Sequence, residues 1–364
     1  MSNNCVLIVA NSVYQLLTAV HMKTSILNGR ETDLLVTNVT QSLSDCLPRL
    51  KESGLFRRVI FGTTKDLSRK YGAAGGEKLT EVFADIPRIF RWVLNEELAD
   101  YSQIYFSNFD IFTRMLACEY DHGDCAFFCY EDGFSSYVID FLREDRAPVN
   151  RHEQASKIKE KIEGYLLYEP GLAMRGDSIK NNALPKMDPH DHRLKQLLNF
   201  IFDYHGTKEP ADFIFLEQSF RAENIPCNDL DLMRECQQDV GTSRFLVKPH
   251  PRNENNIPLQ LGLTRKYPNN IPWELFLLNE GAQGKTVITV CSNAALSGRI
   301  LFGMDIPTVM LYHLFDGKVL WKENDILQKF LRKFHRQFAG KNYYVPNTIY
   351  ELRAILNYLG GSHE

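Results

Sequence analysis

Polar clusters in this 364-residue chain follow directly after short apolar runs, where a parallel sheet would hold a ligand. Two clusters lie in the first half, at 11–15 (NSVYQ) and 131–133 (EDG). Two lie in the second half, at 248–252 (KPHPR) and 291–293 (CSN). Together they offer carboxylates, an imidazole and hydroxyl groups, which can move a proton and bind a phosphate.

The acidic pair Glu131-Asp132 ends the apolar run 126–130, and Gly133 follows it. Adjacent side chains at a strand end point in different directions, so one carboxylate can face a ligand while its neighbour supports it. Such a carboxylate is a candidate general base that removes a proton from an attacking hydroxyl. Gly133 allows a tight backbone turn beside a ligand. An ordinary acidic start of a helix explains the same residues.

His250 stands between two prolines, directly after the run 245–248. Prolines fix φ and restrict the preceding residue, which holds the imidazole in place at low entropic cost. Such a histidine can protonate or hydrogen-bond a leaving phosphate, with positive charge from Lys248 and Arg252. A loop histidine satisfied by backbone carbonyls is the alternative.

Ser292 and Asn293 follow the run 287–290 and precede a predicted helix. Both residue types are preferred N-caps, so helix capping alone explains them. A helix N-terminus also binds phosphate through its free N–H groups and the helix dipole. One residue can serve both purposes.

Several other chemistries find little support in the sequence. His190 and His192 flank Asp191 without a fourth metal ligand nearby, which favours a solvated loop. Asp229 and Asp231 have the DxD spacing of some sugar-nucleotide enzymes, but the start of a helix is the simpler interpretation. The glycine-rich dinucleotide and P-loop motifs are absent. We therefore expect no metal and no cofactor.

Charge and cysteine usage narrow the class of protein further. Lys and Arg number 42 against 45 Asp and Glu, a net charge of −3, so no global basic field indicates a nucleic-acid partner. No apolar run reaches about 18 residues, and no basic, cleavable leader opens the chain. The eight Cys form no CxxC pair, as expected for reduced, buried thiols. These features predict a cytoplasmic protein, with attachment to the inner face of the membrane left open.

Short apolar runs alternate with helical patterns in both halves, which predicts α/β architecture with parallel sheets covered on both faces. The predicted strands are 5–10, 34–36, 59–61, 104–106, 126–130, 213–216, 245–247, 287–290 and 308–311. The predicted helices include 14–27, 79–98, 111–118, 152–166, 230–236 and 294–302.

The polar stretch 181–192 (NNALPKMDPHDH) carries two prolines and is the best linker candidate. We therefore predict two Rossmann-like domains, 1–185 and 186–364, that face each other across a cleft. Residues 326–338 form a basic amphipathic pattern. It suits either packing on the protein's own core or a peripheral contact with an anionic membrane. A homodimer is a further partner that the sequence allows.

Taken in chain order, the motifs at 131–133, 250–251 and 292–293 resemble those of bacterial sialyltransferases. The segment 11–17 (NSVYQLL) is similar to the N-terminal segment of glycosyltransferase family 52. That family contains lipooligosaccharide and capsular sialyltransferases, along with some glucosyltransferases.

The resemblance implies a GT-B fold, an acceptor side in the first domain and CMP-sialic acid bound mainly by the second. It implies that Glu131 is the base, His250 the acid and Ser292 a contact of the CMP phosphate. Asn293 stands where a second Ser or Thr is common, and Asp229 is a reserve base. Asp132 is the second member of the acidic motif. The expected substrate-binding residues are Asn11, Tyr14, Gln15, Gly133, Lys248, Pro251, Arg252, Ser292 and Asn293.

The leading hypothesis is an inverting, metal-independent glycosyltransferase. It would move sialic acid from CMP-sialic acid to a terminal galactose of a lipooligosaccharide or capsular glycan. A leaving CMP carries less charge than a nucleoside diphosphate, so a lysine, a histidine and a helix dipole can stabilise it without a metal. One alternative is a hexosyltransferase that uses a UDP-sugar. Another is a non-catalytic module that binds a nucleotide or a glycan.

Overall fold

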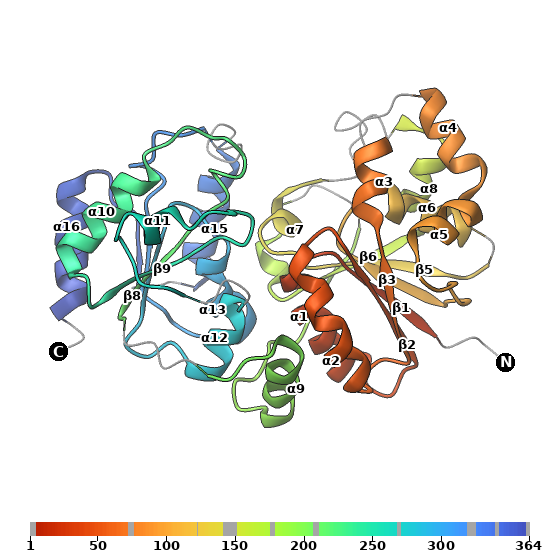
Figure 1. Ribbon diagram of the computed structural model, residues 1–364, viewed down its shortest axis with the longest axis horizontal. Coiled ribbons are helices and arrows are strands. Elements are labelled where there is room, and N and C mark those ends of the chain that lie inside the picture. Colours follow the sequence, from red (N-terminus) through yellow and green to blue (C-terminus); the bar gives the residue numbers. More distant parts are fainter. Residues whose placement is uncertain are drawn as a thin grey trace. The chain divides into compact units, whose positions relative to one another are not determined.

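Both halves of the chain form parallel β-sheets with helices packed against them in the computed structural model (Figure 1). The structure describes residues 5–71, 76–121, 123–140, 151–174, 179–206, 211–267, 271–318, 325–338 and 342–361. The chain divides into two compact units, which we describe separately. Unit 1 comprises Met1–Pro185 and His192–Tyr204, and unit 2 comprises Lys186–Asp191 and His205–Glu364. Residues 192–204 therefore belong to unit 1, although residues 186–191 before them belong to unit 2.

The sheet of unit 1 has the strand order β3-β2-β1-β4-β5-β6-β7, and each neighbouring pair is parallel. Its strands are β1 (Val6–Ala10), β2 (Thr32–Thr37), β3 (Arg58–Gly62), β4 (Gln103–Phe106), β5 (Ala126–Tyr130), β6 (Ile162–Leu167) and β7 (Asn181–Ala183). Every residue of β1 is buried, as expected for a strand with helices on both faces. The strand order reverses between β1 and β4, which is where a parallel sheet opens to a ligand.

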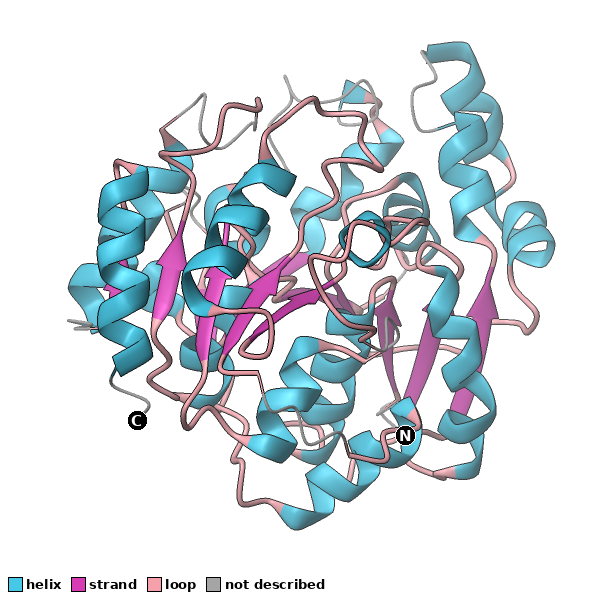
Figure 2. Cartoon of the chain, turned by 60° about the vertical axis from the view of Figure 1, so that its left-hand side comes forward, coloured by secondary structure: helices cyan, strands magenta, loops and turns pink. Residues whose placement is uncertain are grey.

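The helices of unit 1 connect successive strands and cover the sheet (Figure 2). They are α1 (Val13–Thr24), α2 (Leu47–Glu52), α3 (Thr64–Tyr71), α4 (Gly76–Ala84), α5 (Ile86–Val93), α6 (Ile111–Glu119), α7 (Ser135–Val138), α8 (Lys157–Lys161) and α9 (His192–Phe202). The predicted helix 79–98 is divided into α4 and α5 at Asp85, whose Oδ1 accepts a bond of 3.1 Å from the N–H of Arg88.

Unit 2 has a second parallel sheet in the order β12-β11-β10-β8-β9, with its reversal between β10 and β8. Its strands are β8 (Phe213–Leu216), β9 (Phe245–Lys248), β10 (Thr286–Thr289), β11 (Thr308–Met310) and β12 (Tyr343–Tyr344). Its helices are α10 (Asp229–Val240), α11 (Ile257–Gln260), α12 (Trp273–Glu280), α13 (Ala294–Phe302), α15 (Ile326–Phe338) and α16 (Ile349–Gly361).

Two expectations fail where unit 1's sheet ends. The predicted helix 152–166 is helical only as far as Lys161 and then continues as β6, whose last four residues are buried. The predicted linker 181–192 begins with β7, which pairs with β6. Gly164 makes this pairing close, because a Cβ there would lie 2.6 Å from Nδ2 of Asn182. The sequence did not predict these strands, because charged residues precede β6 and the residues of β7 are mostly polar.

A buried carboxylate joins three elements of unit 1. Asp33 on β2 is fully buried and accepts bonds of 2.7 to 3.0 Å from Arg57, Arg58 and the hydroxyl of Tyr101. Burial raises the pKa of Asp33, but these donors outweigh it and hold the pKa below its ordinary value. The cluster ties β2, β3 and the segment before β4 together.

Replacing Asp33 with Asn is expected to lower the free energy of unfolding by roughly 3 kcal/mol, because two cations would lose a buried anionic partner. Since the pKa of Asp33 is lowered by folding, this stabilisation is present at neutral pH and is lost as the pH falls through that lowered pKa. Urea unfolding at several pH values measures both effects. The exposed Asp66→Asn is the control and should change stability by less than about 0.5 kcal/mol.

Candidate active site

The carboxyl ends of β1, β2 and β4 are joined by buried polar side chains. The side chain of Gln15 donates to Asn108 at 3.0 Å and accepts from the N–H of Asn11 at 2.7 Å. The hydroxyl of Thr37 donates to Oδ1 of Asn11 at 2.6 Å. Asn11 and Gln15 are almost fully buried, so we interpret them as groups that hold the strand ends together. This differs from their predicted role as direct substrate ligands.

Glu131 lies inside unit 1 with its hydrogen-bonding capacity largely used. Its exposed fraction is 0%. Its Oε1 accepts from the hydroxyl of Tyr14 at 2.8 Å, and its Oε2 accepts from the hydroxyl of Tyr137 and from the N–H of Tyr168 at 2.8 Å. Burial and then the charge of Glu131 raise the pKa of all three tyrosines, so they remain donors.

These contacts favour a structural role for Glu131 and Tyr14 over the catalytic and substrate-binding roles expected for them. A base must reach an acceptor hydroxyl, and Glu131 is enclosed by donors from α1, α7 and the end of β6. Tyr14, expected to bind substrate, is instead a partner of this carboxylate. No sequence motif links Tyr137 or Tyr168 to Glu131, so the sequence did not indicate that these tyrosines bond to the carboxylate. Only the folding of the chain brings them together.

Asp132, the neighbouring carboxylate, has the surroundings of a base. It is half-buried, and Ser12 Oγ lies 3.4 Å from its Oδ1. Burial raises its pKa to about 6, although hydrogen bonds from Gln15 and Ser12 act in the opposite direction. Gly133 follows with a φ of +70°, a left-handed conformation that turns the chain directly after the carboxylate. A carboxyl group with this pKa can hold and release a proton near neutral pH.

In unit 2, His250 follows β9 at the carboxyl edge of the sheet. The backbone N–H of His250 donates to Oε2 of Glu217 at 2.7 Å. The ring Nδ1 of His250 accepts from the backbone N–H of Arg252 at 3.2 Å. Nδ1 therefore carries a lone pair and the ring proton resides on Nε2. Burial lowers the pKa of His250 to about 4, with further lowering from the charges of Arg252 and Lys248. The ligand-free imidazole is neutral at pH 7 and offers an Nε2–H donor.

Asp229, the reserve base, is unsuited to that role. It is almost fully buried in the first turn of α10, and its Oδ2 pairs with Arg221 at 2.7 Å. Arg221 also pairs with the buried Glu217, which holds the backbone of His250. The sequence analysis missed Glu217 and Arg221, although Glu217 directly follows β8 and so obeys the strand-end rule.

Lys248 and Arg252, both expected to supply positive charge to a phosphate, differ in their exposure to solvent. Lys248 is buried, with its Nζ 5.9 Å from the ring centroid of Tyr267, and burial lowers its pKa while the charge of Glu274 raises it. Arg252 is exposed beside the exposed Pro251 and pairs with Glu223 at 3.1 Å. Lys248 is therefore placed among the residues of the unit's interior, and Arg252 is accessible.

Ser292 and Asn293 precede α13 at the carboxyl end of β10. The N–H of Ser292 donates to Oγ1 of Thr289 at 3.1 Å, and the residue is half-buried. Asn293 is the exposed N-cap, and the described residues provide no side-chain cap for this helix. Ser292, Asn293 and the start of α13 therefore lie at the same edge of the sheet as His250. This arrangement suits a phosphate.

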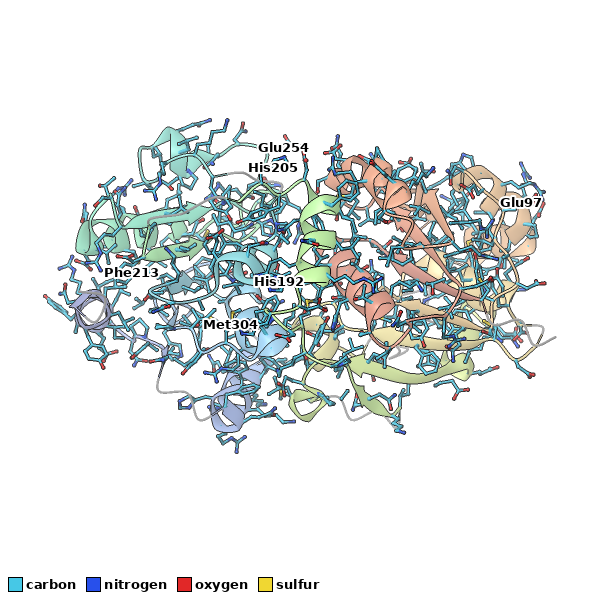
Figure 3. The ribbon with its side chains drawn as sticks, turned by 90° about the horizontal axis from the view of Figure 1, so that it is seen from below. Glu97, His192, His205, Phe213, Glu254 and Met304 are labelled. Atoms are coloured by element: carbon cyan, nitrogen blue, oxygen red, sulfur yellow. The ribbon has the colours of Figure 1, made fainter. Side chains whose placement is uncertain are left out.

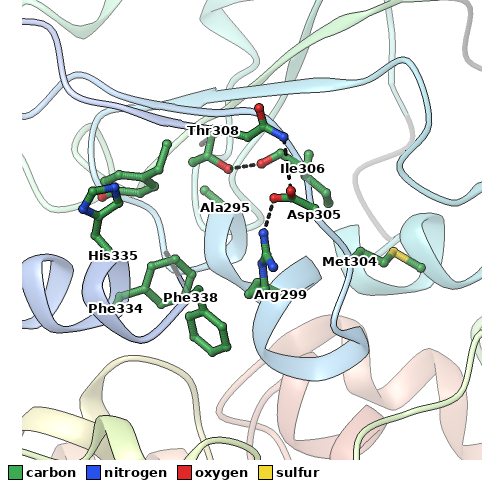
Figure 4. A pocket seen from close by; sticks show the side chains of 11 residues that line it. Ala295, Arg299, Met304, Asp305, Ile306, Thr308, Phe334, His335 and Phe338 are labelled. Atoms are coloured by element: carbon green, nitrogen blue, oxygen red, sulfur yellow. Dashed lines mark hydrogen bonds and ion pairs between the residues drawn. The ribbon is translucent and has the colours of Figure 1, made fainter. Parts of the chain in front are cut away.

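A small pocket in unit 2 lies apart from these strand ends (Figure 4). It runs along α13 to the first residue of β11, Thr308, and α15 contributes Phe334, His335 and Phe338. Arg299 and Asn342 both bond to Asp305 beside it. The pocket contains none of the predicted site residues.

Residues 190–192, for which the sequence favours a solvated loop over a metal site, are exposed in the structure. The N–H of His190 donates to Asp188 at 2.8 Å, and His192 is the first residue of α9 (Figure 3). Within the described part of the chain, no group of three or more His, Cys, Asp or Glu is placed to hold a metal ion. Among the helices of the described residues, none is both long enough and apolar enough to cross a membrane.

Two parallel α/β units in series define the GT-B class of fold, and a comparison with solved structures agrees. The glycotransferase of kitacinnamycin is similar to this chain with a TM-score of 0.55 and 9% identity, over 99% of this chain and 91% of that one. The calicheamicin glycosyltransferase CalG4 gives a TM-score of 0.49 at 12% identity, over 99% and 90%.

A third similar structure is Phytolacca americana UGT2 complexed with UDP-2-fluoroglucose and pterostilbene, with a TM-score of 0.46 at 12% identity, over 100% and 95%. At such low identity the likeness shows the fold alone. No protein-family model matches the chain, and no curated protein matches it. The resemblance to family 52 therefore stays a prediction from the motifs.

The two neighbouring carboxylates should respond oppositely to substitution. Glu131→Ala is expected to lower the free energy of unfolding by ~3 kcal/mol, because three buried donors would lose their acceptor. Asp132→Asn should leave stability at pH 7 unchanged or slightly higher, since folding raises the pKa of Asp132 and disfavours its charge. Urea unfolding of both variants checks this. Equal losses of stability would contradict the division of roles.

Proposed function

We propose that the chain is an inverting glycosyltransferase that transfers a sugar from a nucleotide to a hydroxyl group. The likeness to a GT-B structure over nearly the whole chain supports the class of enzyme. The half-buried Asp132, with its pKa raised to about 6, is the single observation that carries the mechanism. Asp132 belongs to unit 1, and His250 belongs to unit 2.

In this mechanism Asp132 removes the proton of the acceptor hydroxyl while that oxygen attacks the anomeric carbon. The bond from the sugar to the phosphate oxygen breaks, and the nucleotide leaves with the electron pair. Glu131 is a positioning residue, because its bonds to Tyr14, Tyr137 and Tyr168 fix the end of β5 next to the base. Ser12 holds the Asp132 carboxyl from the start of α1.

Unit 2 would bind the leaving nucleotide at its strand edge. The neutral His250 supplies an Nε2–H donor to the phosphate. Of the two roles expected for His250, protonating the phosphate or hydrogen-bonding to it, this is the second. The start of α13 supplies a favourable dipole, although the N–H groups of Ala295 and Leu296 already donate to the carbonyls of Ser292 and Asn293. Together with the histidine donor, this dipole stabilises the negative charge of a monophosphate ester, and the proposal assigns no step to a metal.

For the donor we propose CMP-sialic acid and for the acceptor a terminal galactose of a lipooligosaccharide or capsular glycan. The order of the motifs at 131–133, 250–251 and 292–293 supports this assignment. A UDP-hexose is the alternative donor, since the family that these motifs resemble also contains glucosyltransferases.

The pH dependence of the reaction tests the base. Since burial raises the pKa of Asp132 to about 6, kcat/KM is expected to fall tenfold per pH unit below about 6, as the carboxylate becomes protonated. Asp132→Asn should lower kcat at least about 100-fold and abolish this acid limb. An unchanged acid limb in the Asn variant would assign the base to another group.

The donor is identified by incubating the purified chain with CMP-sialic acid or with UDP-sugars in the presence of EDTA. We expect release of CMP and transfer to a galactose-terminated acceptor. Release of UDP alone would overturn the donor assignment and keep the class of enzyme. Binding of CMP without turnover of any acceptor would indicate a non-catalytic module.

His250→Ala is expected to weaken CMP binding about 10-fold, the loss of one hydrogen bond to a charged phosphate. Calorimetry measures the affinity. His313→Ala is a control, because His313 is an exposed histidine that bonds to Asn347. Equal affinities of the His250 and His313 variants would remove His250 from the phosphate site.

A further inference from the structure

The outer face of α5 in unit 1 is basic and carries an exposed tryptophan. Ile86, Phe90 and Val93 form the buried face of this helix. Arg88 and Trp92, four residues apart, lie on the opposite face, where Trp92 is 52% exposed. This orientation leaves a large indole ring in solvent beside a cation.

The neighbouring helix α3 extends the same surface. Its Thr64, Leu67 and Tyr71 are buried, and its exposed face carries cations. Lys70 joins the two helices, because its Nζ lies 5.5 Å from the ring centroid of Trp92. Figure 1 shows α3 and α5 together in unit 1. We define the α3–α5 face as Lys65, Arg69, Lys70, Arg88, Arg91 and Trp92.

The α3–α5 face has a local charge opposite to that of the chain. The two helices contain five Lys and Arg but a single carboxylate, Asp66, which lies 4.0 Å from Arg69. Among the described residues no ion pair involves Lys65, Arg88 or Arg91. The chain as a whole has a net charge of −3, so the positive charge of this face is a local feature.

The helix for which the sequence allowed either core packing or a membrane contact packs its apolar face into the interior of unit 2. Residues Leu327, Phe330, Leu331 and Phe334 of α15 are buried. Its apolar face therefore packs on the protein's own core, which is one of the two alternatives considered for this segment. The buried apolar residues of α15 are therefore not available to a membrane.

We propose that the α3–α5 face docks on a membrane surface rich in anionic phospholipid. Cations near such a surface are attracted to the phosphate groups of the lipid, and tryptophan favours the boundary between headgroups and acyl chains. Nucleic acid is the less favoured anion, because the face carries one exposed ring rather than a series of rings on which bases stack. The proposal is independent of the proposed enzymatic activity.

Vesicle binding of the full chain tests the proposal without any substrate. The protein should co-sediment with phosphatidylcholine vesicles that contain about 30% phosphatidylglycerol, and bind pure phosphatidylcholine weakly. Raising NaCl from about 0.1 M to about 0.5 M should reduce binding. Replacing both Arg88 and Arg91 with Gln is expected to lower the partition coefficient at least about 10-fold.

Tryptophan fluorescence locates the contact. In a Trp321→Phe background, brominated lipid should quench the protein, and adding Trp92→Phe should remove most of this quenching, because the remaining Trp273 is buried in unit 2. Circular dichroism of each variant checks that it is folded.

Arg332→Gln with Arg336→Gln is the matched control, since both are exposed arginines on α15. This control should bind vesicles like the wild type. Loss of binding in the α15 variant alone would overturn the proposal and transfer the contact to that helix. Absence of binding to anionic vesicles, or tighter binding to a short DNA duplex than to vesicles, would also overturn it.

Discussion

The strands of each sheet run in the same direction, and the placement of the polar side chains depends on this constraint. Because the strands are parallel, their carboxyl ends meet at one edge of the sheet, where the chain must leave a buried strand and enter a helix. The residues that follow β1 and β5 meet there, so Ser12 and Asp132, 120 positions apart, become hydrogen-bonded neighbours. In unit 2 the same constraint brings Glu217 beside His250.

Adjacent residues at such an edge can have opposite environments. Glu131 points into unit 1, where hydroxyl groups and a backbone N–H compensate its burial. Asp132 has weaker compensation, so burial dominates and raises its pKa. The difference comes from the direction of each side chain and not from the residue type. One carboxylate thereby fixes the strand end, and the other keeps a reactive protonation equilibrium.

The imidazole of unit 2 shows the converse effect. Burial and the charges of Arg252 and Lys248 disfavour a third positive charge, so His250 is neutral without a ligand. A phosphate bound at the same edge would bring negative charge and favour protonation. Glu217 accepts from the backbone of His250, and its charge is paired with Arg221. The position of the ring and its protonation are therefore controlled by different neighbours.

Sequence pattern by itself determined the class of fold and the strands that carry the site. The buried runs at β1, β5, β8 and β9 are strongly apolar, and apolar periodicity is a local property. The strand-end rule then located Asp132, His250 and Ser292 at sheet edges. The tertiary structure alone decided which carboxylate is enclosed, because Tyr137 and Tyr168 reach Glu131 only after the sheet has formed. It also decided that β6 and β7 are strands, since their pairing depends on the approach of Asn182 to Gly164, which no local pattern encodes.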